Sequence, residues 1–138
     1  MIDPLQSSIR VAASALDAQS MRIRVVSENI ANAQTTGAGP GDDPYARKTI
    51  TFAGELSRSD NANVVVVRGV GVDNAPFRIV RDPGHPAADI QGNVKMPNVD
   101  PFTELADLKE ANRSYEANLQ TIKQARDLFS MTIDLLKS

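Results

Sequence analysis

The residues best suited to acid–base or metal chemistry are few and isolated in this sequence. His85 is the sole histidine and lies in the segment Asp82-Pro83-Gly84-His85-Pro86. A histidine beside an aspartate can act as a general acid or base, but no nucleophile motif, carboxylate pair or second ligand accompanies this one. We therefore assign His85 to a turn or an interface, and we predict that the chain is not an enzyme.

The composition argues against several other kinds of site. The 138 residues include no cysteine, which excludes disulfides and thiolate metal ligands. The formal net charge is −2 with no basic tract, so nucleic acid is not an expected partner. The longest run of strong hydrophobes, Val64 to Val67, is far shorter than the roughly 20 residues of a transmembrane helix. We expect no cofactor, no metal and no membrane span.

Glycine and proline divide the sequence into three parts. All eight glycines lie between Gly37 and Gly92, while residues 5–33 and 102–138 contain neither glycine nor proline. Because both residues break helices, their absence favours two long terminal helices. The expected division is an N-terminal coiled-coil helix in residues 1–36, a middle region in 37–98 and a C-terminal coiled-coil helix in 99–138.

Both terminal parts carry apolar residues in alternating steps of three and four, which is the pattern of a coiled-coil seam. Asp3-Pro4 and Asp100-Pro101 can cap the two helices, with proline in the first turn. The main apolar seam positions are Leu5, Ile9, Leu16, Ile23, Val26 and Ile30 in the first helix, and Leu108, Tyr115, Leu119, Ile122, Phe129, Ile133 and Leu136 in the second.

The middle part has short β-branched segments separated by turn residues. Thr49 to Phe52, Asn63 to Val72 and Phe77 to Val80 are candidate strands, and Gly37 to Pro44 is a candidate flexible loop. The expected fold class is mainly α: long N- and C-terminal helices paired as a coiled coil, with a small Gly/Pro-rich β/loop region between them.

The two seams favour an assembly subunit over a monomer. A single heptad helix is most simply an element of a monomeric bundle. Here the two helices can pair and bury each other's seam. Flanking apolar residues such as Val11, Met21, Leu105 and Leu128 would still be exposed to water. Identical or homologous chains could cover them. A soluble coiled-coil adaptor or chaperone that binds partner helices remains the alternative.

Two sets of motifs resemble those of the bacterial flagellar axial proteins, which form the rod and hook. Ser27 to Thr36, with Asn29-Ile30-Ala31-Asn32 at its centre, is similar to the signature that ends their N-terminal helix. Asp82-Pro83-Gly84-His85-Pro86 and Glu110 to Asn118 resemble segments of the proximal-rod members.

The resemblance implies a structural subunit of the proximal rod in the flagellar basal body, which assembles through its terminal helices into the axial drive shaft of cell motility. Its implied partners are other proximal and distal rod proteins, the rod–MS-ring junction protein and copies of itself. It also implies passage through the flagellar type III export apparatus to the periplasm. This agrees with the N-terminal sequence, where Asp3 and Pro4 stand in place of the basic residues of a cleavable signal peptide.

Overall fold

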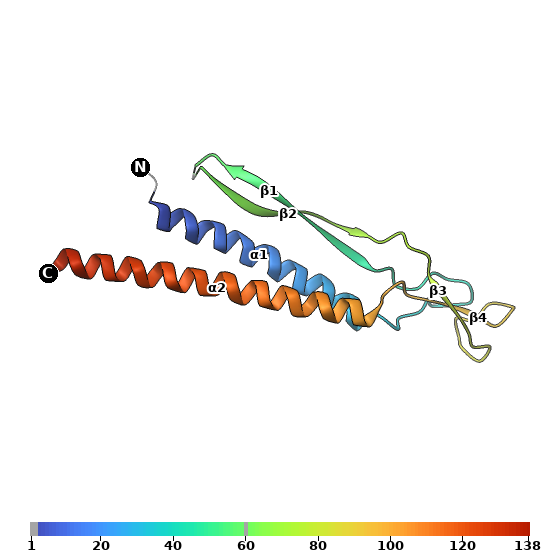
Figure 1. Cartoon of the computed structure of the whole chain (residues 1–138). Coiled ribbons are helices and arrows are strands. Elements are labelled where there is room, and N and C mark those ends of the chain that lie inside the picture. The colour runs from blue at the N-terminus through green and yellow to red at the C-terminus, as the bar shows by residue number, and fades with distance from the viewer. Residues whose placement is uncertain (1–2, 60) are drawn as a thin grey trace. The chain divides into compact units, whose positions relative to one another are not determined.

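A computed structural model describes residues 3–59 and 61–138, which form two long helices and two small sheets (Figure 1). Helix α1 (Pro4–Ala31) has 28 residues and helix α2 (Pro101–Lys137) has 37. Between them lie strands β1 (Lys48–Ser57), β2 (Ala62–Val72), β3 (Arg78–Arg81) and β4 (Asn93–Met96).

Both helices begin at an Asp-Pro pair. Asp3 Oδ1 accepts a hydrogen bond from the backbone N–H of Leu5 at 3.0 Å. Asp100 accepts one from the N–H of Phe102 at 3.1 Å and one from the hydroxyl of Thr103 at 2.9 Å. These contacts satisfy N–H groups that have no partner in the first turn of a helix. Proline at the first helical position lacks such an N–H and so costs nothing there.

The four strands form two separate two-stranded sheets. Strands β1 and β2 make the longer sheet and run in opposite directions (Figure 1). Strands β3 and β4 are antiparallel, and their register places Arg78 opposite Met96 and Arg81 opposite Asn93. No described helix is long and apolar enough to cross a lipid bilayer.

The predicted fold class is wrong, because the middle of the chain is not a small Gly/Pro-rich β/loop region. It folds into two antiparallel sheets, and strands account for 21% of the structure. The glycines at 54, 69 and 71 lie inside β1 and β2, and none of them has a positive φ. The β-branched residues around these glycines therefore decide the local structure, and the glycines do not interrupt it.

The chain divides into two compact units, the first built from three segments and the second from two. Unit 1 contains Met1–Ile23, Thr51–Gly69 and Lys109–Ser138. Unit 2 contains Arg24–Ile50 and Val70–Leu108, so both ends of the middle region belong to unit 2. The fully buried large side chains, namely Glu104, Val94, Asn29 and Pro97, all belong to unit 2. The best-packed core of the described chain therefore lies in unit 2.

Unit 1 packs the first part of α1 against the last part of α2 and against β2. The two helices are antiparallel: Ile9 and Phe129 line the same cavity, and Arg22 forms an ion pair with Glu110 at 3.5 Å. On another side of α1, the hydroxyl oxygen of Ser14 accepts a hydrogen bond from the N–H of Val65 in β2 at 3.1 Å. The buried residues of unit 1 are small: Ala12, Ala18, Ala111 and Ala125.

Candidate assembly interface

The predicted seam residues are mostly half-buried in the described chain. Val26 is buried, and Phe129 and Leu136 are exposed at 50% and 83%. The remaining ten have intermediate burial: Leu5, Ile9, Leu16, Ile23, Ile30, Leu108, Tyr115, Leu119, Ile122 and Ile133. A half-buried stripe keeps apolar surface that a further helix can cover. The role of these residues in contacts between subunits stays a prediction.

Sequence reasoning gave too little weight to small residues in the helix contacts. On α2 the deepest positions are Glu104, Ala111 and Ala125, which repeat at multiples of seven. Ala111 is 0% exposed, whereas the neighbouring Asn112 is exposed. Alanine lets helix backbones approach closely because only a methyl group separates them. The signal for these positions was present in the sequence as alanine at heptad spacing.

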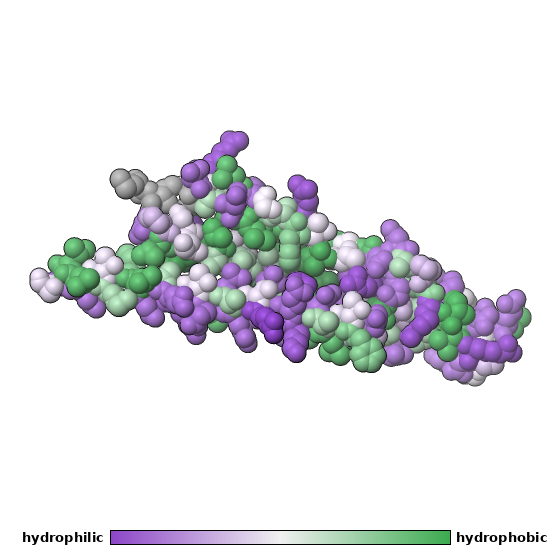
Figure 2. All heavy atoms as spheres, viewed as in Figure 1, coloured by the Kyte–Doolittle hydropathy of each residue, from purple (hydrophilic) through white to green (hydrophobic). Residues whose placement is uncertain are grey.

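The last three turns of α2 carry large apolar side chains that the described chain covers only in part. Leu128, Phe129 and Met131 are each about half exposed, and Leu135 and Leu136 are 77% and 83% exposed. Figure 2 shows this end of α2 as an apolar surface. We name these five residues the terminal patch. Exposed apolar clusters of this kind are often found at the interaction sites of proteins.

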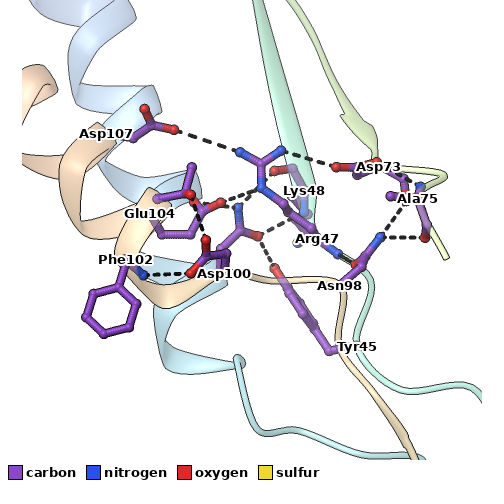
Figure 3. A network of polar contacts seen from close by, with 12 residues as sticks. Tyr45, Arg47, Lys48, Asp73, Ala75, Asn98, Asp100, Phe102, Glu104 and Asp107 are labelled. Atoms are coloured by element: carbon purple, nitrogen blue, oxygen red, sulfur yellow. Dashed lines mark hydrogen bonds and ion pairs between the residues drawn. The ribbon is translucent and has the colours of Figure 1, made fainter. Parts of the chain in front are cut away.

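The motif residues Asn29 to Asn32 lie at the end of α1, where Asn29 takes part in four hydrogen bonds. Its partners Tyr45, Lys48 and Glu104 are labelled in Figure 3. Its side-chain amide donates to the carbonyl of Lys48 at 2.9 Å and to Oε2 of Glu104 at 3.2 Å. Its Oδ1 accepts from the hydroxyl of Tyr45 and from the N–H of Lys48, both at 2.8 Å. Every polar atom of this buried amide is therefore satisfied. Asn32 closes the helix by donating to the carbonyl of Glu28 at 2.9 Å.

Arg47 is the centre of an ionic cluster next to Asn29 (Figure 3). Its guanidinium binds Oε1 of Glu104 through Nε, Oδ2 of Asp73 at 3.4 Å and Oδ2 of Asp107 at 3.8 Å. Its backbone N–H donates to Oδ1 of Asn98 at 2.8 Å. Glu104 is fully buried, so a charged carboxylate can remain there only with partners of this kind.

The cluster also shifts the acid–base behaviour of its members. Burial alone would lower the pKa of Arg47, but the hydrogen bond and charge of Glu104, together with Asp73, outweigh it, so the net pKa is raised. The pKa of Tyr45 is raised by burial, with further contributions from the negative charges of Glu28 and Glu104. Arg47 therefore stays protonated and Tyr45 stays neutral at physiological pH.

The segment Asp82-Pro83-Gly84-His85-Pro86 forms the turn that follows β3. The N–H of His85 donates to the carbonyl of Asp82 at 3.1 Å, and the His85 Nδ1 accepts from the N–H of Ala87 at 3.0 Å. One ring nitrogen is thus used to hold the turn. Among the described residues, no group of three or more histidine, aspartate or glutamate side chains could hold a metal ion.

Comparison with known proteins agrees with the motifs. Residues 9–38 match the family described as Flagella basal body rod protein, and residues 90–135 match the one described as Flagellar basal body rod FlgEFG protein C-terminal. The chain is 56% identical to the flagellar basal-body rod protein FlgC of Agrobacterium fabrum over 137 residues, which is 99% of both chains.

More distant relatives carry the same name. The FlgC protein of Salmonella typhimurium is 38% identical over 125 residues, covering 91% of this chain and 92% of that protein. The FlgC protein of Bacillus subtilis is 37% identical over 145 residues, covering 94% and 97%. The chain therefore belongs to the FlgC family of flagellar basal-body rod proteins.

Proposed function

We propose that this chain, a structural subunit of the flagellar basal-body rod, joins the proximal rod by burying its terminal patch and seam residues against neighbouring rod subunits. The observation that carries the proposal is the terminal patch, where five large apolar side chains lie at least about half exposed at the end of one helix. A polar solvent-facing helix end would need no such residues.

The burial of the patch contributes to the free energy of assembly. A large apolar side chain that becomes fully buried contributes about 1.5–3 kcal/mol. Further burial of the five patch residues on each subunit offsets part of the rotational and translational freedom that the subunit loses, and the seam residues add to this contribution. Two long helices joined to neighbours along their length also resist bending and twisting, as a shaft that transmits torque requires.

The partners of the chain include other components of the flagellar rod. Within that set we propose proximal and distal rod proteins, the rod–MS-ring junction protein and further copies of this chain. We also propose that the subunit reaches the periplasm through the flagellar type III export apparatus. A soluble adaptor or chaperone would be a second function, but the relatives compared above are all rod proteins.

A substitution at an exposed residue of the terminal patch tests assembly without disturbing the folding of the subunit. Leu136→Asp changes an 83% exposed side chain, so the free energy of unfolding of the isolated subunit should change by less than about 0.5 kcal/mol. We expect cells with this variant to lack rods and not to swim, because a charge now lies in an interface that excludes water.

Gln124→Asp is the matched control, because it places the same charge at an exposed polar position of the same helix. Purified basal bodies should contain the Gln124→Asp protein and lack the Leu136→Asp protein, as measured by immunoblot. Normal swimming and normal incorporation of Leu136→Asp would refute the role of the terminal patch.

A further inference from the structure

The sheet of β1 and β2 has one covered edge and one open edge. On the covered edge, the N–H of Val65 in β2 donates to Ser14 of α1 at 3.1 Å. Among the described strands β1 pairs only with β2, so its other edge has no strand partner within residues 3–59 and 61–138. Along the open edge Gly54, Glu55 and Leu56 are all exposed, and Leu56 is 57% exposed. Backbone N–H and C=O groups on such an edge can pair with another strand.

The sheet of β3 and β4 also has an open edge, and the arginines of β3 have the opposite charge to Glu55 in β1. Strand β3 pairs with β4 alone, and all four of its residues are exposed. Ile79 is 57% exposed and Val80 is 42% exposed. Arg78 and Arg81 flank this apolar pair, and neither forms an ion pair within the described residues. Proteins protect edge strands with charged side chains, bulges, prolines or covering segments. The two arginines of β3 disfavour pairing with a strand of like charge and favour a partner strand that carries a carboxylate.

We propose that these two edges join neighbouring copies of the chain, with β3 of one copy adding to the outer edge of β1, at Gly54 to Ser57, in the next. The occupant of each edge is thus a second copy of this protein. The proposal rests on the proposed rod function. A contact between two different surfaces of the same protein repeats from copy to copy, and it gives either a closed ring or an open filament such as a rod.

Charge and side-chain pattern select the register. In an antiparallel pairing that places Leu56 opposite Ile79, two exposed apolar side chains cover each other on one face. Glu55 then lies opposite Val80 on the other face and diagonal to Arg78, within reach of an ion pair. Gly54 stands opposite Arg81 and leaves room for its long side chain. If β1 carried a basic residue in place of Glu55, two positive charges would lie next to each other in this register.

Four paired residues form a weak contact by themselves, because a short two-stranded pairing is marginally stable in water. The contact therefore acts only after the terminal helices have brought two copies together, when the second contact becomes intramolecular. This explains how an open apolar edge can exist on a subunit that must not aggregate before assembly.

Cysteine cross-linking tests the pairing directly, because the natural chain contains no cysteine. Residues opposite each other in an antiparallel pair have Cα atoms about 4.5–5.5 Å apart, which a disulfide can bridge. Leu56→Cys combined with Ile79→Cys should give dimers and larger oligomers on non-reducing gels after mild oxidation of purified basal bodies. Either single variant should stay monomeric.

The control pair is Leu56→Cys with Ile90→Cys, in which the second position is more exposed than Ile79 but lies outside β3. It should not cross-link. Basal bodies that contain the 56/79 double variant but yield no cross-link would overturn the edge pairing and leave the rod function intact. Absence of the natural chain from basal bodies would instead overturn the rod function.

Charge reversal provides a test that does not depend on cysteine. Arg78→Glu should lower the fraction of swimming cells about tenfold, because a like charge now faces Glu55. Adding Glu55→Arg should restore swimming, whereas Arg68→Glu, an exposed change outside the pairing, should have no effect. Failure of Glu55→Arg to rescue, or unchanged swimming with Arg78→Glu alone, would count against the pairing.

Discussion

The side-chain amide of Asn29 donates a hydrogen bond to Oε2 of Glu104 at 3.2 Å, and both residues are 0% exposed. The contact joins the last turn of α1 to the first turn of α2 within unit 2, although 75 positions separate the two residues in sequence. Arg47 binds the other oxygen of the same carboxylate. Unit 2 is therefore organised around a buried anion, and its stability should depend on that anion.

Glu104→Ala is expected to lower the free energy of unfolding by about 3–5 kcal/mol, because it leaves the Arg47 charge and the Asn29 amide without their partner. Urea denaturation followed by circular dichroism measures the change. Glu110→Ala is the control, since the Glu110 side chain is 67% exposed and its ion pair with Arg22 lies at the surface. It should change the same quantity by less than about 1 kcal/mol. Equal losses in the free energy of unfolding for Glu104→Ala and Glu110→Ala would show that the buried position of Glu104 adds nothing to stability.

The stability of unit 2 should fall at alkaline pH because of Tyr45. The pKa of Tyr45 is raised above 10.0 in the folded state by burial and by the charges of Glu28 and Glu104. Above pH 10 the unfolded chain therefore loses a proton that the folded chain keeps, so the free energy of unfolding decreases as pH rises.

Tyr45→Phe isolates this effect. It removes the hydrogen bond to Asn29 and should cost about 1 kcal/mol at neutral pH. Its stability should then decline less between about pH 8 and pH 10.5, a range that includes the ordinary tyrosine pKa. All other side chains are common to the two proteins, so the difference between the two pH profiles reports on Tyr45. Parallel decline of the two proteins, measured as urea midpoints, would contradict the prediction.

Ala111→Leu tests the close packing of α2 in unit 1. Ala111 is 0% exposed, so a larger side chain has no room and should destabilise the subunit by about 1–3 kcal/mol. Ala117→Leu, at an exposed position of the same helix, should change stability by less than about 0.5 kcal/mol. Thermal denaturation of both variants gives the comparison. An unchanged stability of Ala111→Leu would show that α2 is not closely packed at this position.

Gly92→Ala tests the turn between β3 and β4. Gly92 has a φ of 82°, and a Cβ atom there would lie 2.9 Å from the Cγ of Pro83. We expect a loss of about 1–3 kcal/mol, because alanine disfavours this backbone region and the proline ring cannot move freely. Gly84→Ala should be tolerated in the same denaturation experiment, since its Cβ would meet only Asp82 at 3.8 Å.

The sequence carries strong local signals and weak long-range ones. The start of each helix can be predicted because Asp3-Pro4 and Asp100-Pro101 act within one turn. Strand β2 could also be predicted, to within one residue, despite its two glycines. The full extent of β1 could not, because the predicted segment Thr49 to Phe52 stops before Gly54, which adopts ordinary strand geometry. Strand β4 alternates polar and apolar residues, but it is only four residues long, and so short an alternation is a weak signal without its pairing with β3.

The ionic cluster was also invisible to sequence patterns. Arg47 and Glu104 are 57 positions apart, and each looks like an ordinary charged residue in its own segment. Only the fold brings them together and buries the carboxylate. By contrast, Asn29 stood out through its motif, but its four hydrogen bonds required the partners at Tyr45, Lys48 and Glu104.

The antiparallel helix pairing of unit 1 has a practical consequence for anyone who wishes to attach a tag. Leu5 in the first turn of α1 and Phe129 near the end of α2 line a common cavity, so the start of α1 lies beside the terminal patch. An epitope or fluorescent fusion at either end would therefore obstruct the same apolar surface. Gly41 offers a better insertion point, because it lies in an exposed turn of unit 2 with open space around its Cα.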